Sequence, residues 1–210
     1  RLDPWFDAYA DRAHNLRASE IRALFSVVSR PEVVSLAGGM PNLKDLPLES
    51  LAETAKSLIL TSGAQALQYG SGQGWEPLRE QLVSVMTYDG IIGADPDDVV
   101  ITTGSQQALD LMAELFINAG DVVLAESPSY VGALGCFRAR QADVVHVDMD
   151  EDGLIPEALE ETIRRLKSAG RAIKFLYTIP NFQNPAGVTL TLERRQRIAE
   201  ICMREHVLIL

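Results

Sequence analysis

The chain has 210 residues, which is long enough for one large domain or for one domain with an additional arm. Apolar residues make up 47% of it and charged residues 23%, close to the average for folded soluble proteins, so the composition argues against a disordered or fibrous chain. The 29 acidic and 19 basic residues give a formal net charge of −10. A charge of this sign repels phosphate backbones, so nucleic acid is not expected as a partner.

The sequence carries no signal-peptide pattern, and its longest apolar runs are far shorter than the roughly 20 residues that span a bilayer. Two cysteines, Cys136 and Cys202, lie 66 positions apart, which does not suggest a disulfide framework. We therefore expect a cytoplasmic protein with no membrane partner. Cys202 and His206 have the spacing of two ligands on one helix face, but a metal site needs three or four ligands, so no metal is expected.

Apolar residues in the first hundred positions recur at helical spacing in two places. The pattern predicts one short helix over residues 21–28 and another over 48–59 that ends near Gly63. Because no long strand separates these helices, we expect this region to be an arm or part of a second domain.

From residue 97 onward, short solid apolar runs alternate with helical patterns. Strands are expected at 99–101, 122–124, 144–147, 173–177 and 207–210. Helices are expected at 108–116, about 130–140, 156–169 and 192–205. Strands that are apolar on both sides are typical of a parallel sheet, so we predict an α/β fold whose mostly parallel sheet has helices on both faces. No turn signal follows the last run, and the chain is expected to end inside a strand.

The first candidate binding loop precedes the predicted helix over 108–116. In parallel α/β sheets, ligands bind at the carboxyl ends of strands, where loops turn into helices. Gly104 allows a tight turn there, and Ser105 lies where the backbone N–H groups and the dipole of a helix start attract an anion. The alternative is an ordinary serine cap with no ligand.

Two further loops follow predicted strands. The segment Ser127–Tyr130 places the Tyr130 ring at a strand end, and prolines on both sides of Asn184 restrain the backbone in the segment 180–187. A packed ring and a bare turn are the respective alternatives. Taken together, the anion site, the ring and the fixed amide describe a cup for a flat, phosphorylated ligand.

Several segments also match one known family in order and spacing. They are Ser35–Pro41, Leu67–Gly70, Gly74 with Leu78 and Arg79, Ile101–Leu109, Ser127–Tyr130 and Tyr177–Gly187. Over about residues 17–210 the sequence resembles the N-terminal portion of the fold-type I, class I and II pyridoxal-phosphate aminotransferases, in particular the 2-aminoadipate and kynurenine aminotransferases.

The resemblance implies an incomplete pyridoxal-phosphate-binding large domain over residues 46–210 and an N-terminal arm over residues 1–45 that belongs to the small domain. It implies pyridoxal 5'-phosphate as cofactor. By position, the phosphate cradle is formed by Gly104, Ser105 and Gln106. Tyr130 stacks on the pyridine ring, and Asn184 donates a hydrogen bond to the phenolate oxygen of the cofactor.

Residues for the partner subunit and the substrate are implied in the same way. Tyr69 reaches the phosphate of the neighbouring subunit, so the active unit is a homodimer. Gly39 lies against the substrate, and Ser19 and Arg22 match positions near its side chain. For Ser19 and Arg22, a pair of surface residues on a helix is an equally good interpretation.

The activity implied is the transfer of an amino group between an amino acid and a 2-oxo acid through a pyridoxal-phosphate imine, with this chain supplying half of the cofactor site. No catalytic residue is assigned within the chain. None of its four lysines (Lys44, Lys56, Lys167 and Lys174) lies in a Ser-x-Ser-Lys context. The Schiff-base lysine is therefore expected beyond Leu210, and so is the aspartate that pairs with the ring nitrogen.

Two alternatives share these motifs. One is a transcriptional regulator in which an aminotransferase-like domain senses a ligand behind a DNA-binding head. Residues 1–15 hold three acidic residues and two arginines and show no sign of such a basic head. The other is a pyridoxal-phosphate-dependent lyase or synthase on the same scaffold, which would differ in substrate contacts beyond this chain.

Overall fold

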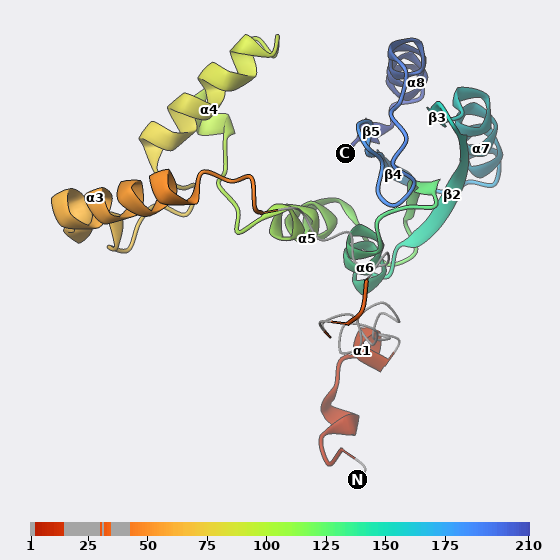
Figure 1. The fold of residues 1–210 in the computed structure, drawn as a ribbon. Coiled ribbons are helices and arrows are strands. Elements are labelled where there is room, and N and C mark those ends of the chain that lie inside the picture. The colour runs from red at the N-terminus through yellow and green to blue at the C-terminus, as the bar shows by residue number, and fades with distance from the viewer. Residues whose placement is uncertain (1–2, 15–29, 31, 35–42) are drawn as a thin grey trace. The chain divides into compact units, whose positions relative to one another are not determined.

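The computed structural model describes residues 3–14, 30, 32–34 and 43–210 (Figure 1). The chain divides into two compact units. Residues 103–210 together with 1–19 form one, here called the sheet unit, and residues 20–102 form the other, here called the helical unit. In the described parts of the chain, no helix is both long and apolar enough to cross a membrane.

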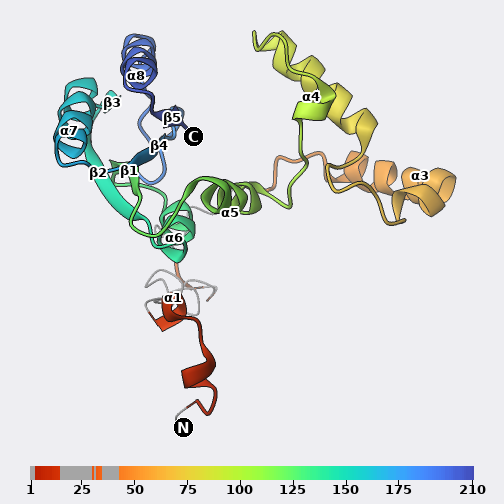
Figure 2. The same ribbon diagram turned by 180° about the vertical axis from the view of Figure 1, so that it is seen from behind.

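The sheet unit is built on five strands in the order β3-β2-β1-β4-β5 (Figures 1 and 2). Their bounds are β1 (Val122–Ser127), β2 (Asp143–Asp150), β3 (Gly153–Leu154), β4 (Ile173–Tyr177) and β5 (Leu208–Ile209). β1 pairs in parallel with β2 and β4, and β4 pairs in parallel with β5, whereas β3 is antiparallel to β2. The predicted mostly parallel sheet is thus confirmed.

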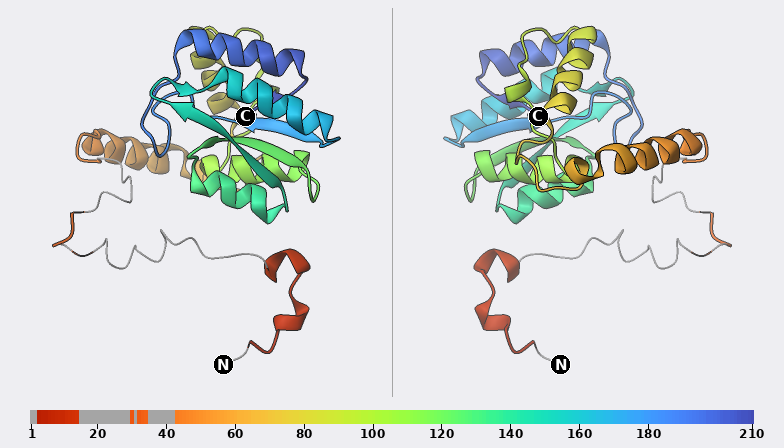
Figure 3. Two further views of the ribbon diagram at one scale, coloured as in Figure 1. Left: turned by 90° about the vertical axis from the view of Figure 1, so that its right-hand side faces the viewer. Right: turned by 90° about the vertical axis from the view of Figure 1, so that its left-hand side faces the viewer.

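Helices cover both faces of this sheet (Figure 3). They are α5 (Ser105–Phe116), α6 (Val131–Ala139), α7 (Pro156–Ser168) and α8 (Leu192–Arg204). Because successive side chains of a strand point to opposite faces, Val122 and Leu124 of β1 pack with α7 and α8, while Val123 and Ala125 pack with α5 and α6. All four residues are fully buried. The predicted α/β layer structure is confirmed. Residues 122–125 of β1 are continuously apolar because both faces of this strand are buried.

The helices of the sheet unit follow the apolar spacing of the sequence. In α7, Pro156 occupies the first turn, where its missing N–H costs nothing, and Leu159, Ile163 and Leu166 form the buried stripe. Thr191 caps α8 by accepting from the backbone N–H of Arg194 at 3.5 Å. The predictions for 130–140, 156–169 and 192–205 are correct to within about a residue at each end.

The helical unit contains α3 (Leu48–Ala66), α4 (Glu76–Tyr88) and the short 3-10 helix η2 (Pro96–Asp98), and no strand forms among its described residues. The end predicted near Gly63 corresponds to a kink, because Ser62 has non-helical angles of φ −138° and ψ 22° and the helix then resumes. Helix α4 was not anticipated from the sequence.

The strand predicted at 99–101 is wrong. The backbone N–H of Ile101 donates to the carbonyl of Gln73 at 2.8 Å, and no strand pairs with this segment in the described part of the chain. The side chain of Ile101 lies so close to Gly74 that a Cβ there would be 2.4 Å from Ile101 Cγ1. The apolar run at 99–101 therefore packs against the loop that contains Gln73 and Gly74 and does not form a strand. Val100 in this run is 53% exposed.

Residues 3–14 contain the 3-10 helix η1 (Phe6–Ala8) and helix α1 (Asp11–His14). The helix predicted over 21–28 lies outside the described residues. The domain boundary expected after residue 45 stays a prediction. The two compact units are divided at other positions, after residues 19 and 102.

Candidate functional site

Helix α5 begins with an end that no side chain caps. Its N-cap is Gly104, whose φ of 77° and ψ of 167° belong to a conformation that L side chains rarely adopt. The first turn holds no acidic residue, and Ser105, the first helical residue, is exposed. The dipole and the backbone N–H groups of this twelve-residue helix therefore favour an anion at this position.

Gln106 brings the start of α5 to the start of α6. Its Nε2 donates to the carbonyl of Gly132 at 3.3 Å and lies 2.9 Å from Sγ of Cys136, and the hydroxyl of Tyr130 is 3.5 Å from its Oε1. Tyr130 is the N-cap of α6. Of the residues predicted from the sequence, the structure thus brings Ser105, Gln106 and Tyr130 together at one end of the α5/α6 layer.

Gly132 is a part of this arrangement that the sequence analysis missed. A Cβ built on it would be 2.5 Å from Cζ and from the hydroxyl oxygen of Tyr130, and 2.6 Å from Cε1. The Tyr130 ring therefore occupies the space that a side chain at position 132 would take. A glycine two residues after the tyrosine is the sequence signal for this packing, although one glycine does not specify which ring it accommodates.

The third predicted loop follows β4 and carries Asn184, which is exposed, next to a cis peptide bond to Pro185. Its buried member is Gln183, which is only 2% exposed. Gln183 Oε1 accepts from the backbone N–H of Ala186 at 2.8 Å, and this bond closes the turn around Asn184. The prolines on both sides of Asn184 indicated the exposed amide, whereas no pattern in the sequence indicated the buried amide of Gln183 beside it.

Two buried groups near Tyr130, a phenol and a thiol, have raised pKa values. Burial raises the pKa of Tyr177, at the end of β4, to about 12, with further contributions from Glu126, Tyr130 and Cys136. Burial also raises the pKa of the Cys136 thiol, and Asp110 adds to the effect. Both groups are therefore neutral at physiological pH, and Cys136 lacks the thiolate character of a nucleophile.

The remaining predicted residues are Tyr69, Gly39, Ser19 and Arg22. Tyr69 belongs to the helical unit and is 96% exposed. Gly39, Ser19 and Arg22 lie outside the described residues, so their substrate roles stay predictions.

Three lysines of the chain form ion pairs with carboxylates. Lys56 pairs with Glu53 at 3.7 Å, Lys167 with Glu205 at 2.9 Å and Lys174 with Asp121 at 3.2 Å. The expectation that the covalent lysine lies beyond Leu210 stays a prediction.

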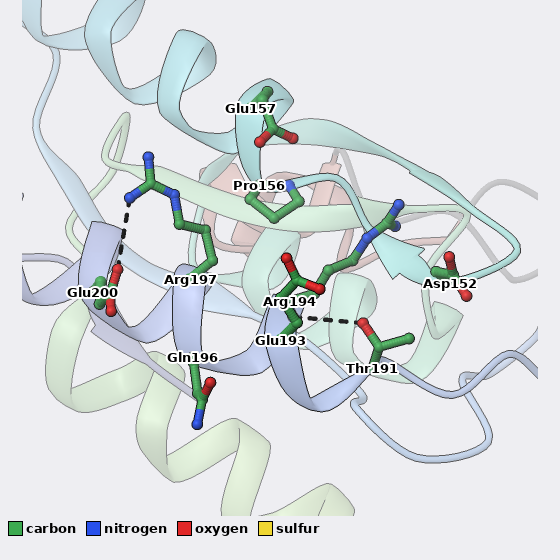
Figure 4. Close-up of a pocket in the computed structure, with 9 residues that line it drawn as sticks. All are labelled: Asp152, Pro156, Glu157, Thr191, Glu193, Arg194, Gln196, Arg197 and Glu200. Atoms are coloured by element: carbon green, nitrogen blue, oxygen red, sulfur yellow. Dashed lines mark hydrogen bonds and ion pairs between the residues drawn. The ribbon is translucent and has the colours of Figure 1, made fainter.

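A hollow of about 600 Å³ lies on the other face of the sheet, at the starts of α7 and α8 (Figure 4). Its two arginines are engaged locally: Arg194 Nη2 is 2.8 Å from Asp150 Oδ2, and Arg197 lies 3.6 Å from Glu160 and from Glu200. Because carboxylates neutralise both cations, this hollow does not offer an anion site. The candidate site is instead the end of the α5/α6 layer.

Comparison with known proteins identifies the class. The family model for aminotransferase class I and II matches residues 31–210, and the chain belongs to this family. The predicted family is thus confirmed.

Individual relatives are similar over almost the whole chain. It is 40% identical over 201 residues to aromatic-amino-acid aminotransferase 1 of Thermococcus litoralis, covering 96% of this chain and 48% of the relative. It is 38% identical over 205 residues to 2-aminoadipate transaminase of Thermus thermophilus, covering 98% of this chain and 49% of the relative. The chain therefore spans about half the length of the curated relatives it matches.

Solved structures of aminotransferases are also similar to the chain. Kynurenine aminotransferase of Pyrococcus horikoshii, crystallised with PMP, superposes with a TM-score of 0.88 at 39% identity, covering 96% of this chain and 50% of that one. The α-aminoadipate aminotransferase LysN of Thermus thermophilus, crystallised with N-(5'-phosphopyridoxyl)-L-leucine, gives a TM-score of 0.83 at 38% identity, covering 98% and 49%. Both belong to the subgroup that the sequence motifs indicated.

Proposed function

We propose that the full-length protein is an aminotransferase that moves an amino group between an amino acid and a 2-oxo acid with pyridoxal 5'-phosphate as cofactor. The observation that carries this proposal is the uncapped start of α5 next to Tyr130. It supplies an anion site and an aromatic ring within one small region. Family membership and the cofactor derivatives in the two related structures support the same conclusion.

The described residues fit this cofactor. Gly104, Ser105 and Gln106 would hold the phosphate, because an N-terminal helix end without acidic neighbours stabilises a dianion. Tyr130 would supply an aromatic face for the flat ring. The cofactor, when bound, acts as an electron sink for the substrate carbon.

Asn184 would donate to the phenolate oxygen of the ring. The exposed position of Asn184, on a turn closed by Gln183, leaves its amide available for this contact. A hydrogen bond to the charged form of an oxygen stabilises that form. The lysine that binds the cofactor covalently is expected outside these 210 residues.

The active unit is a cytoplasmic homodimer in which Tyr69 donates to the phosphate held by the neighbouring subunit. The 96% exposure of Tyr69 supports a role outside its own unit. Sedimentation analysis of the full-length protein checks the dimer, and a monomer that is fully active contradicts it.

A titration of the full-length protein tests the cofactor assignment. Pyridoxal phosphate is added while visible absorbance is followed, and inorganic phosphate serves as competitor. We expect saturable binding that Ser105→Ala and Gln106→Ala weaken about tenfold each, because the first removes a hydroxyl donor to the phosphate and the second removes the amide that holds Tyr130 and Gly132 beside it. Binding that neither substitution affects contradicts the proposed cradle.

A panel of amino donors tests the reaction. Aromatic amino acids, 2-aminoadipate, kynurenine and alanine are offered with several 2-oxo acids, and formation of the new amino acid is measured. We expect turnover with at least one pair. A protein that binds the cofactor and releases ammonia or cleaves a carbon bond instead would be a lyase, and the proposed transfer would be wrong.

A further inference from the structure

The end of β1 contains a buried carboxylate that the proposed reaction does not use. Glu126 is 1% exposed and follows four fully buried apolar residues of the central strand. Burial of a carboxylate is costly unless hydrogen bonds replace its lost hydration. Within the described part of the chain, no cationic side chain forms an ion pair with it, so donors from another segment must stabilise it.

Three donors do so, and all come from the loop that follows β4. Thr178 Oγ1 donates to Glu126 Oε1 at 2.6 Å. The backbone N–H of Ile179 and Nε2 of Gln183 both donate to Oε2, at 3.2 Å and 3.0 Å. Hydrogen bonds to a charged acceptor are among the stronger ones in proteins.

Gln183 provides a second link between the same two segments. Besides reaching Glu126, its Nε2 donates to the carbonyl of Pro128 at 2.9 Å. Pro128 lies two residues before Tyr130, and Gln183 directly precedes Asn184. The segment 126–130 and the segment 178–187, which carry the two residues assigned to the cofactor ring, are therefore linked to each other by hydrogen bonds.

We propose that Glu126 is a positioning residue that locks the Tyr130 segment to the Asn184 segment, so that the ring and the amide engage the cofactor as one rigid unit. This inference rests on the proposed function. A carboxylate suits the task because it accepts from all three donors and donates to none. A glutamine of the same size would direct its own NH₂ group at one of them.

The decisive measurement compares Glu126→Gln with the wild type in the full-length protein. We expect the affinity for pyridoxal phosphate to fall about tenfold and the visible circular dichroism of the bound cofactor to lose amplitude, because the ring is no longer held in one orientation. In the cofactor-free protein, hydrogen exchange should accelerate in both segments, 127–132 and 178–188. Unchanged affinity and dichroism, or faster exchange in one segment only, overturn the proposal.

A matched pair of milder variants separates positioning from general stability. Thr178→Val removes one donor to Glu126, whereas Thr191→Val is the same substitution in the cap of α8, where the hydroxyl accepts from the backbone N–H of Arg194. We expect about threefold weaker cofactor binding for the first and an unchanged affinity for the second, although both lose a hydrogen bond. Equal effects on cofactor binding would show that Glu126 serves stability alone.

The same data distinguish the two proposals. A wild-type protein that binds no pyridoxal phosphate contradicts the proposed function. The exchange experiment needs no cofactor, so it still decides whether Glu126 couples the two segments.

Discussion

The two units of the chain use their apolar residues in opposite ways. The sheet unit buries aromatic and aliphatic side chains on both faces of its sheet, and Phe137, Phe175 and Leu124 are completely inaccessible. The only buried residue among those described in the helical unit is Arg79. Several large apolar side chains of that unit stay exposed, among them Leu60 at 76% and Tyr88 at 91%.

This difference indicates where the stability of the chain originates. Burial of apolar surface is the main favourable contribution to folding, so the sheet unit contains a core of its own and the described helical unit does not. The candidate site residues Ser105, Gln106, Tyr130 and Asn184 all belong to the unit with the core, which provides the rigid support that a binding site needs.

The largest effect is expected from a pair of truncations, one in each unit. Phe137 is fully buried and meets Phe175 and Tyr177 edge-on, at ring-centroid distances of 5.2 and 5.5 Å. Phe137→Ala should lower the free energy of unfolding by about 3–5 kcal/mol. Leu60→Ala, in α3, should change it by less than about 0.5 kcal/mol, because an exposed side chain loses no packing.

Urea unfolding of the full-length protein, followed by circular dichroism, measures both values. Phe137→Leu serves as a smaller truncation if the alanine variant does not fold. A large cost for Leu60→Ala would break the comparison, because it would show that the apolar surface of α3 is covered in the full-length protein.

The sequence predicted the core of the sheet unit well because its signal is local. Solid apolar runs identified β1 and β4, and the helical pattern over 156–169 identified α7. The run at 99–101 failed because three apolar residues suit a strand and a packed loop equally well. Whether they pair depends on neighbours that are distant in sequence.

The candidate site shows the same limit. A glycine and a serine at a helix start are recognisable from adjacent residues, so Gly104 and Ser105 could be chosen in advance. The pairing of Glu126 with Thr178 and Gln183 spans 52 and 57 positions. No periodicity encodes such a contact. The only sign of it in the sequence was an acidic residue, Glu126, directly after the apolar run of β1.

A smaller effect on the free energy of unfolding is expected at high pH, where Tyr177 of the sheet unit loses its proton. Burial raises the pKa of Tyr177 from 10.0 to about 12, so the folded protein holds this proton more tightly than the unfolded chain does. The resulting stabilisation is fully present below pH 10 and is lost as the pH rises through 12. Its size is about 2 kcal/mol.

Unfolding free energies measured between pH 9 and pH 12 test this, with Tyr177→Phe as the comparison. Phenylalanine has no proton to lose, so the variant should show a shallower decline in stability over this range. Parallel declines in the two proteins would mean that the Tyr177 hydroxyl is accessible to solvent.

The smallest effect is expected at Gly132, where it is confined to ligand binding. Gly132→Ala places a methyl group where the Tyr130 ring now lies, 2.5 Å from its Cζ, so the ring must leave its present position. We expect the affinity for pyridoxal phosphate to fall about tenfold, or about 1.4 kcal/mol. Gly135→Ala in the same helix is the matched control, because a Cβ there meets nothing within 4 Å.

Both substitutions replace glycine by a better helix former, so neither should destabilise α6 through its backbone. A loss of cofactor affinity in the Gly132 variant alone therefore reports on the position of the Tyr130 ring and not on the helix that carries it. Equal affinities in the two variants would mean that the ring adjusts without loss, and Tyr130 would then contribute to the fold of the sheet unit and not to its ligand.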